Sequence, residues 1–370
     1  MVITLTPKTT KFSISKRYYT RRTSMYCKRC GSEIDNSSFF CSKCGQKINS
    51  DNINNDFFIR GGVLEKYLGN STNPSIPEGV VEISREAFQN CAQLKAITFP
   101  SSMVVAHIID CHNLERININ NRIKKLFVDD CKSLKFIELP NGIERVRLNK
   151  CAIQSLKIPA SVKAISDDAF SECVELENIM LPDGIEIIGK KAFYHCIKLK
   201  KIDLPDSIHT LGKEAFRQCK SLKRITIPSK VTTLPAGVFQ ECHSLTEVII
   251  PSNITRMEGA DGDSGWYSST GAFMECTNLK KVTFTNSISF LSDNSFKGCK
   301  NLTDVSMPFE MYNRLSRKNT MLGDKHKSYI IGFENTPISW KYAESCQYCG
   351  SKFKGMFNKK CSRCGKPKDY

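Results

Sequence analysis

Apolar residues recur along the middle of the chain in a phrase that repeats about every 23 residues. Two adjacent copies, Leu181–Asp203 and Leu204–Thr226, match position by position: each opens with Leu-Pro, carries Ala-Phe halfway, and has a Cys three residues after the Phe. Self-similarity at a fixed period of roughly 20–50 residues is the signature of a solenoid, in which each repeat forms one coil and stacks on the next. The pattern therefore predicts a stack of coils.

The apolar positions inside one repeat predict the course of a coil. Ile202 and Leu204 are separated by one polar residue, which is the alternation of a strand whose apolar side faces inward. The segment Ile185–Ile188 predicts a second short extended stretch, and Ala192–Phe193 predicts a helical turn in which the Phe fills the middle of the coil. The Cys that follows is small enough for a buried corner. The predicted fold class is a repeat solenoid of short parallel β-strands joined by short helical turns.

The cysteines serve as markers of the coils, one in each repeat. The first three intervals between them are 20 residues, the others are 22 or 23, and the interval from Cys242 to Cys276 is 34. The 20-residue coils lack Ala-Phe, and the long interval contains an 11-residue insertion within Arg256–Thr270. The ten markers are Cys91, Cys111, Cys131, Cys151, Cys173, Cys196, Cys219, Cys242, Cys276 and Cys299.

This repeat resembles the leucine-rich repeats of the BspA-like, or Treponema pallidum, type. The resemblance rests on the recurring Leu-Pro, Ala-Phe and Cys positions and covers roughly residues 57–309. It implies a solenoid of the leucine-rich-repeat type. It leaves the function open, because repeat scaffolds of one fold serve many different partners.

Four Cys-x-x-Cys pairs lie outside the repeats, two at each end of the chain. Such a pair places both sulfurs on one side of a tight turn, and two facing turns make a tetrahedral four-thiolate site that suits Zn²⁺. Both ends resemble zinc ribbons, so we expect two structural zinc ions. The alternative is ordinary or disulfide-bonded cysteines. The predicted ligands are Cys27, Cys30, Cys41 and Cys44 at one end, and Cys346, Cys349, Cys361 and Cys364 at the other.

The order of these modules predicts the domain organisation. Residues 1–24 are polar and basic without periodicity, which is typical of a disordered tail, and Met25 is an alternative start because it opens the first Cys module directly. The other predicted segments are a zinc ribbon (25–46), a polar linker (47–56), an N-terminal cap (57–75), the leucine-rich repeats (76–309), a C-terminal cap or linker (310–343) and a second zinc ribbon (344–370).

Outward-facing positions of the repeated strand define the predicted partner surface. With this strand lining the concave face, the residues beside its central apolar position point into solvent and mix both signs of charge with isolated apolar side chains. This mixture favours a protein partner over a polyanion, and the alternative is a surface with no partner. The inserted loop adds a Trp and a Tyr, which favour protein contact unless they fold back onto their own coil. The candidate partner-binding residues are Phe136, Met180, Lys201, Arg224, Ile249, Trp266 and Tyr267.

Positive charge is concentrated at the two ends of the chain. The net charge of +17 divides into +7 for residues 1–60, +9 for residues 311–370 and +1 for everything between them. The second ribbon interleaves basic residues with Phe353 and Phe357, which suggests a second hypothesis, nucleic-acid binding through the basic ribbons. The alternative is that these aromatics only cover the metal site. The candidate nucleic-acid contacts are Lys352, Lys354, Lys359 and Lys360.

Composition bears on the remaining classes of function. No apolar run approaches the roughly 20 residues of a membrane span, and the start of the chain lacks the apolar stretch of a secretory signal. With 18 cysteines in these patterns, we expect reduced thiols and a cytoplasmic monomer. BspA-like relatives include exported adhesins, so a cell-surface adhesin is a third hypothesis. The sequence has no Gly-rich phosphate loop, paired-acid site or triad, and the leading prediction is a non-enzymatic protein-interaction scaffold.

Overall fold

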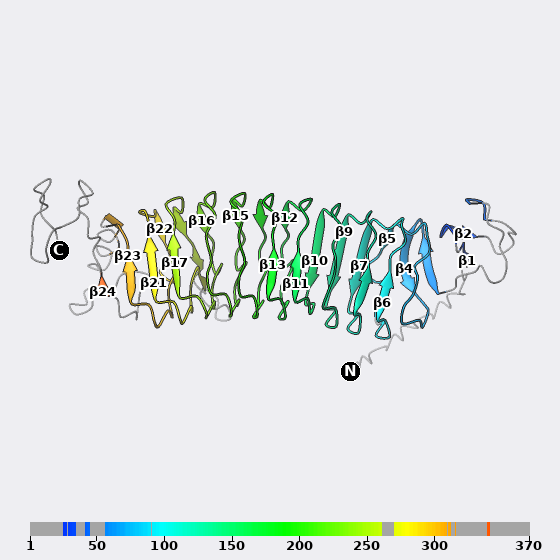
Figure 1. Ribbon diagram of the computed structural model, residues 1–370, viewed down its shortest axis with the longest axis horizontal. Helices are drawn as coiled ribbons and strands as arrows, with labels where there is room; N and C mark the ends of the chain where they lie inside the picture. The colour runs from blue at the N-terminus through cyan, green and yellow to red at the C-terminus, as the bar shows by residue number, and fades with distance from the viewer. Residues whose placement is uncertain are drawn as a thin grey trace, which may run out of the picture.

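Coils follow one another along a single long axis (Figure 1). The computed structural model describes residues 25–27, 29–34, 41–44, 56–89, 91–260 and 270–308, together with 310–311, 315 and 339–340. Neighbouring coils pair in parallel and in register, so that Ile187 lies beside Thr210 and Ile188 beside Leu211, one repeat apart. The predicted leucine-rich-repeat solenoid is confirmed.

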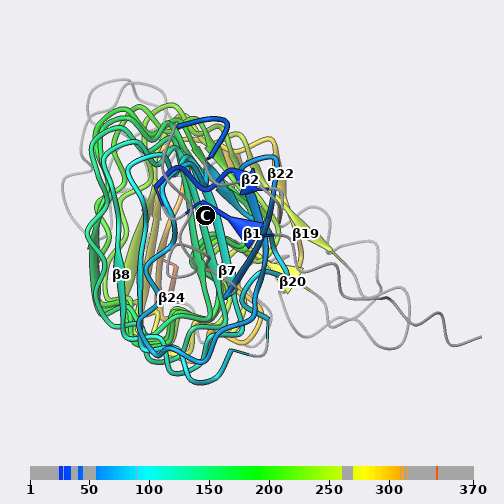
Figure 2. The same ribbon diagram turned by 90° about the vertical axis from the view of Figure 1, so that its right-hand side faces the viewer.

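The coils present two β-faces on opposite sides of the stack, as Figure 2 shows for β7 and β8. The β7 face consists of β3 (Phe57–Arg60), β4 (Val63–Tyr67), β5 (Glu82–Ile83), β7 (Val105–Ile109), β9 (Lys125–Asp129), β10 (Arg145–Asn149), β12 (Ala164–Ile165), β14 (Ile187–Ile188), β15 (Thr210–Leu211), β16 (Thr233–Leu234), β18 (Arg256–Met257) and β22 (Phe290–Leu291). The β6 face consists of β6 (Ala96–Thr98), β8 (Arg116–Asn118), β11 (Ser155–Lys157), β13 (Asn178–Met180), β17 (Glu247–Ile250), β21 (Lys281–Phe284), β23 (Asp304–Ser306) and β24 (Ser339–Trp340).

Antiparallel hairpins occur where the chain departs from the regular coil. At the N-terminal end β3 pairs antiparallel with β4, which then pairs parallel with β5, so a hairpin closes the first coil. Before it, β1 (Met25–Tyr26) pairs with β2 (Glu33–Ile34). Within the predicted insertion, β19 (Gly259–Ala260) pairs with β20 (Thr270–Gly271).

The interior is a continuous apolar core that runs the length of the stack. The phenylalanines predicted to fill the coils form one column, in which adjacent rings lie 5.2–5.5 Å apart with planes within 21° of each other. Stacked aromatic pairs of this kind add to the free energy gained by burying their surface. The column consists of Phe170, Phe193, Phe216, Phe239, Phe273 and Phe296.

The 20-residue coils replace the Ala-Phe turn with a longer strand. Their residues at the Phe position, Ile108, Val128 and Leu148, lie within the five-residue strands β7, β9 and β10 and are fully buried. The junction with the longer coils is hydrogen-bonded, because Leu148 N–H donates to the carbonyl of Ala169 at 2.7 Å. A straight strand needs fewer residues than a turn to cross the same width, so both coil lengths fit one stack.

The turn around Ala-Phe consists of successive i→i+3 hydrogen bonds. In one coil Ala169 N–H donates to Ser166 O at 3.2 Å, and Cys173 N–H donates to Phe170 O at 3.3 Å. Asp168 and Glu172 have φ of 53° and 58°. Both places also have positive φ in the next three coils, and the second place keeps it at Glu275 and Gly298. These left-handed residues interrupt a right-handed helix, so the predicted helical turn does not become a helix.

Candidate metal centre and partner-binding face

The first Cys module brings its four thiols together. Gly31 N–H donates to Cys27 O at 2.8 Å and closes the first Cys-x-x-Cys turn, in which Gly31 has a φ of +67°. The Sγ atoms of Cys27 and Cys44 lie 3.5 Å apart, and those of Cys30 and Cys41 lie 3.4 Å apart. All four sulfurs are within 4.8 Å of one another.

This geometry fits a metal ion. Tetrahedral Zn²⁺ with Zn–S bonds of about 2.3 Å separates its sulfur ligands by about 3.8 Å. Burial of the Cys41 thiol opposes its ionisation, but hydrogen bonds from the backbone of Cys44 and Lys43 and from the side chains of Cys30 and Ser32 together lower its pKa to about 6. Ser32, which the sequence analysis did not single out, places its hydroxyl 2.6 Å from Cys30 Sγ and so supports a ligand. The group can hold a metal by its four thiolates.

The other predicted ligands, Cys346, Cys349, Cys361 and Cys364, lie outside the described residues, and so do Lys352, Lys354, Lys359 and Lys360. Across the part of the chain that the structure describes, the first Cys module is the one group of at least three His, Cys, Asp or Glu side chains arranged to hold a metal. The second zinc site and the nucleic-acid hypothesis therefore stay predictions.

The repeat cysteines have a different environment. The thiol of Cys219 is fully buried and donates to Phe193 O at 3.2 Å, and Cys196 donates in the same way to Phe170 O at 3.1 Å. Burial raises the pKa of both thiols well above their ordinary value. These residues are protonated hydrogen-bond donors inside the core, and they are not positioned as metal ligands or nucleophiles.

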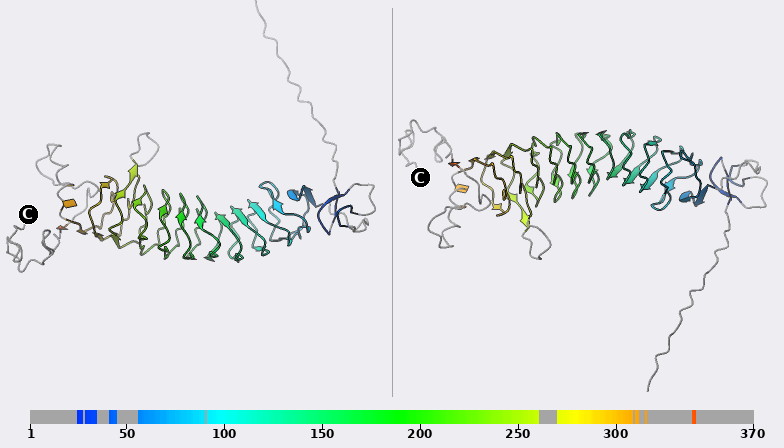
Figure 3. Two further views of the ribbon diagram at one scale, coloured as in Figure 1. Left: turned by 90° about the horizontal axis from the view of Figure 1, so that it is seen from above. Right: turned by 90° about the horizontal axis from the view of Figure 1, so that it is seen from below.

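The β6 face carries the predicted partner-binding residues of the repeats. The stack is only gently curved, so this face is broad and open (Figure 3). Phe136, Met180 and Ile249 leave 64%, 61% and 61% of their surface exposed. Lys201 lies in a coil between those of Met180 and Ile249, and its Nζ is 2.8 Å from the carboxylate of Asp203.

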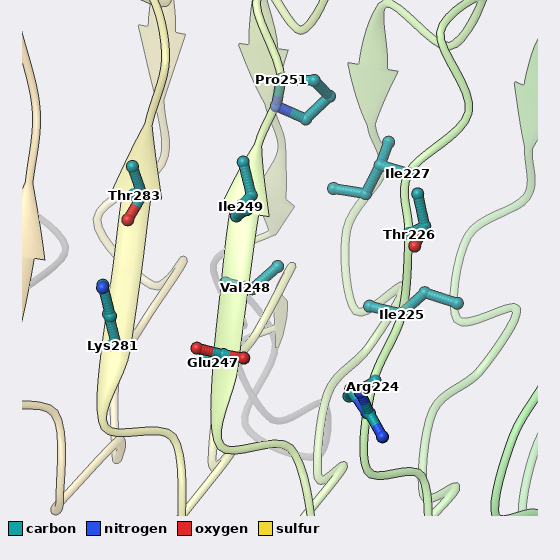
Figure 4. A pocket seen from close by; sticks show the side chains of 10 residues that line it. All are labelled: Arg224, Ile225, Thr226, Ile227, Glu247, Val248, Ile249, Pro251, Lys281 and Thr283. Carbon is teal, nitrogen blue, oxygen red and sulfur yellow. The ribbon is translucent and has the colours of Figure 1, made fainter.

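Two shallow depressions mark this face. The first has a volume of about 600 Å³, with Phe136 and Met180 in its lining and Ile137 and Ile179 among the residues between them. The second has a volume of about 360 Å³. Figure 4 shows its outward side chains in two rows, Arg224, Glu247 and Lys281 in one and Thr226, Ile249 and Thr283 in the other.

Each depression lies beside a coil that forms no β-strand on this face. Residues 136–139 and 224–227 form no strand, although the same positions are strands β8, β11, β13 and β17 in other coils. At the first of these places Ile137 is only partly buried, whereas the equivalent Ile117 and Ile179 are buried. Ile137 thus contributes apolar surface to the lining of the first depression. Ile137 follows the repeat consensus, so nothing in the sequence indicated that it would be partly exposed.

The hairpin that carries the inserted loop leaves the stack on the other side. The loop's aromatic residues Trp266 and Tyr267 lie outside the described residues. The hairpin β19–β20 that carries the loop starts two residues after β18 of the β7 face, and Figure 2 shows it on the side of β22, away from β8. The hairpin and the β6 face therefore lie on different sides of the stack.

Comparison with known proteins identifies the repeat. The family described as "BspA type Leucine rich repeat region" matches residues 66–149, 142–260 and 267–318 in six copies. The chain belongs to this family. Leucine-rich-repeat proteins of this kind act as protein-interaction or surface scaffolds, and their extended faces supply the binding area.

Solved structures similar to this BspA-type chain are also leucine-rich-repeat proteins. A leucine-rich cell surface protein of Faecalibacterium prausnitzii is 19% identical, with a TM-score of 0.44, over 81% of this chain and 96% of its own. A leucine-rich-repeat protein of Bacteroides ovatus is 23% identical, with a TM-score of 0.38, over 68% and 86%. The Treponema pallidum leucine-rich-repeat protein is 22% identical, with a TM-score of 0.27, over 71% and 88%.

No curated protein matches the BspA-type chain. The described residues contain no helix with the length and apolar character needed to cross a membrane.

Proposed function

We propose that this protein is a non-enzymatic scaffold that binds a protein partner on the β6 face. The observation that carries the proposal is the pair of depressions with Phe136, Met180 and Ile249 exposed at their surfaces. Burying one such side chain in an interface contributes about 1.5–3 kcal/mol. Three of them spaced along one open face supply the apolar anchors around which protein interfaces are built.

The charges around these anchors support a protein partner. Along one row of the face Arg224, Glu247, Lys281 and Asp304 alternate in sign, with Glu247 beside Lys281 and Lys281 beside Asp304. A surface that binds a polyanion presents a stripe of one sign. Alternating charges instead select a partner with a complementary pattern, and they set specificity more than affinity.

Zinc at both ends is part of the proposal, and so is a reducing, cytoplasmic location. The four clustered thiols at residues 27–44 support the first zinc site, and a second set of two Cys-x-x-Cys pairs, with a spacer one residue longer, supports the second. Native mass spectrometry with a thiol count after chelation tests both points. We expect two zinc ions and 18 reduced thiols. Disulfides within the Cys-x-x-Cys pairs and no metal would favour the adhesin hypothesis.

The partner surface is tested with matched variants of the full chain. The β6-face variant is Phe136→Ser with Met180→Ser and Ile249→Ser. The control is Ile187→Ser with Phe290→Ser, which removes exposed apolar residues from the opposite, β7 face. Proteins captured from cell extract by the wild-type chain are quantified against both variants by mass spectrometry. A direct partner is lost with the β6-face variant and retained by the control.

The loop is tested separately with Trp266→Ser and Tyr267→Ser. Because the hairpin leaves from the other side of the stack, these substitutions are expected to leave β6-face binding intact. Equal retention of every captured protein by the β6-face variant and the control would overturn the proposal.

A further inference from the structure

The first Cys module rests directly on the first coil of the solenoid. A Cβ placed on Gly79 would overlap the carbonyl oxygen of Cys30, and a Cβ placed on Gly31 would lie 2.5 Å from the carbonyl oxygen of Glu78. Two backbone turns, Cys30–Gly31 and Glu78–Gly79, therefore touch without side chains between them. A substitution on either glycine pushes the turns apart.

The repeat itself does not require the conformation of Gly79. Gly142 and Gly184 occupy the same place after Pro in later coils, and other coils have Ser, Lys or Asn there. Among these positions Gly79 has the positive φ, +92°. A Cβ on Gly142 would meet nothing closer than 3.6 Å. The left-handed backbone and close approach at Gly79 thus arise from the contact with the Cys module.

The turn that receives the module is fixed to the second coil. The Glu78 carboxylate accepts hydrogen bonds from Ser101 N–H and Ser101 O–H, both at 2.9 Å. The Ser101 N–H, as the largest contribution, lowers the pKa of Glu78. Gly79 N–H donates to Ser102 Oγ at 2.9 Å. A displacement of the Glu78–Gly79 turn is therefore transmitted into the next coil.

A second attachment lies next to a ligand. Tyr26, which precedes Cys27, is 2% exposed and belongs to the apolar core of the solenoid. Cys27 and Cys41 belong instead to a small cluster of their own with Ile34. The module is thus held at the Cys30–Gly31 turn and at Tyr26, with the sulfur cluster between them.

We infer that metal binding by Cys27, Cys30, Cys41 and Cys44 and folding of the first two coils form one coupled equilibrium. The Cys module is a metal-dependent cap of the solenoid. Metal ligation orders the Cys30–Gly31 turn, and the ordered turn holds Glu78–Gly79 in place. By linkage, metal binding strengthens the contact by the same factor by which the formed contact strengthens metal binding. This inference rests on the proposed zinc site.

Hydrogen exchange on the wild-type full chain tests the coupling without any substitution. Zinc is removed with a chelator, and exchange is followed peptide by peptide. Amides of residues 63–67 and 80–84, and those of 101–106, are expected to lose protection on zinc removal, whereas β14 and β15 keep theirs. Unchanged exchange at residues 63–106 in protein shown to have lost its zinc would overturn the inference.

A pair of glycine variants tests the reciprocal effect. Gly79→Ala is expected to weaken zinc binding at the first site by about 10- to 100-fold, the range typical of residues that support metal ligands. Gly142→Ala, at the same place in an open coil, is the control and leaves zinc affinity unchanged. Affinity is measured by competition with a chromophoric chelator. Equal affinities in the two variants would refute the coupling, whereas absence of zinc from the wild-type site would refute the metal site itself.

Discussion

The ring of Phe216 lies 5.2 Å from the ring of Phe193, with 6° between their planes. On its other side Phe216 stacks on Phe239 at 5.5 Å, so each ring of the column supports two coils. Phe216→Ala is expected to lower the free energy of unfolding by about 3–5 kcal/mol, because it leaves a cavity between Phe193 and Phe239 that these rings cannot move to fill. Urea denaturation followed by circular dichroism measures the loss.

Phe136→Ala is the control for that substitution. This residue is 64% exposed on the β6 face, so truncation is expected to change stability by less than about 0.5 kcal/mol. If the two substitutions lower the free energy of unfolding equally, the phenylalanine column does not stabilise the stack of coils.

The repeat thiols are expected to be unreactive in the folded protein. Cys196, Cys219 and Cys242 are fully buried, and burial raises their pKa well above the ordinary value, so thiolate is not available. Cys30 and Cys44 of the metal centre are only partly buried. Iodoacetamide labelling after chelation, mapped by peptide mass, should modify Cys30 and Cys44 before the repeat cysteines. Early labelling of Cys219 would show that the coils open.

Stability is expected to depend on pH through His107. The ring stacks on Phe127 at 4.6 Å, and burial, followed by the charge of Arg85, lowers its pKa below 6.5, against the opposing charges of Glu82 and Asp129. The folded state therefore binds its proton at a lower pH than the unfolded chain. This contribution to stability is complete above about pH 6.5 and decreases as the pH falls towards the folded pKa.

His107→Phe keeps the stacked ring and removes the titrating group. We expect wild type to lose more stability than the variant between pH 7.5 and pH 5.5, measured as the shift in urea midpoint. Parallel loss in the two proteins would show that His107 does not contribute.

The inserted loop is expected to be dispensable for the stack. Phe239 N–H donates to Ala272 O and Glu241 N–H to Met274 O, both at 2.8 Å, which repeats the bonds between ordinary coils. Replacing residues 261–269 with a short Gly-Ser turn should change thermal stability by less than about 0.5 kcal/mol. Deleting nine residues from a regular coil, 206–214, is the contrasting change and should destabilise the stack strongly because it breaks the register.

The repeat pattern predicted the main features of the fold. The 23-residue step gave the parallel register directly, since residues one repeat apart, such as Ile187 and Thr210, lie side by side. It also placed Phe193 and Cys196 in the interior, where both are fully buried. Apolar side chains at a fixed period have one way to be buried together, which is why this part of the structure can be read from one sequence.

The details of the surface could not be read in the same way. Ile137, Ile179 and Ile225 occupy the same repeat position, yet only Ile137 of the three is partly exposed. Gly79 and Gly142 also share a position, and only the contact with Cys30 distinguishes them. Lys191 and Glu214 both have positive φ, but they differ in residue type, and neither type marks such a backbone conformation in a sequence. These features depend on what lies beside the residue in space.

The hairpin at the insertion has a practical consequence. Gly259 lies opposite Gly271, and Ala260 opposite Thr270, so the chain leaves and re-enters the coil at one point. A fluorophore or reporter peptide grafted between them would sit on the opposite side of the stack from the β6 face. Such a probe would report on capture of a partner without occupying the surface that makes the contact.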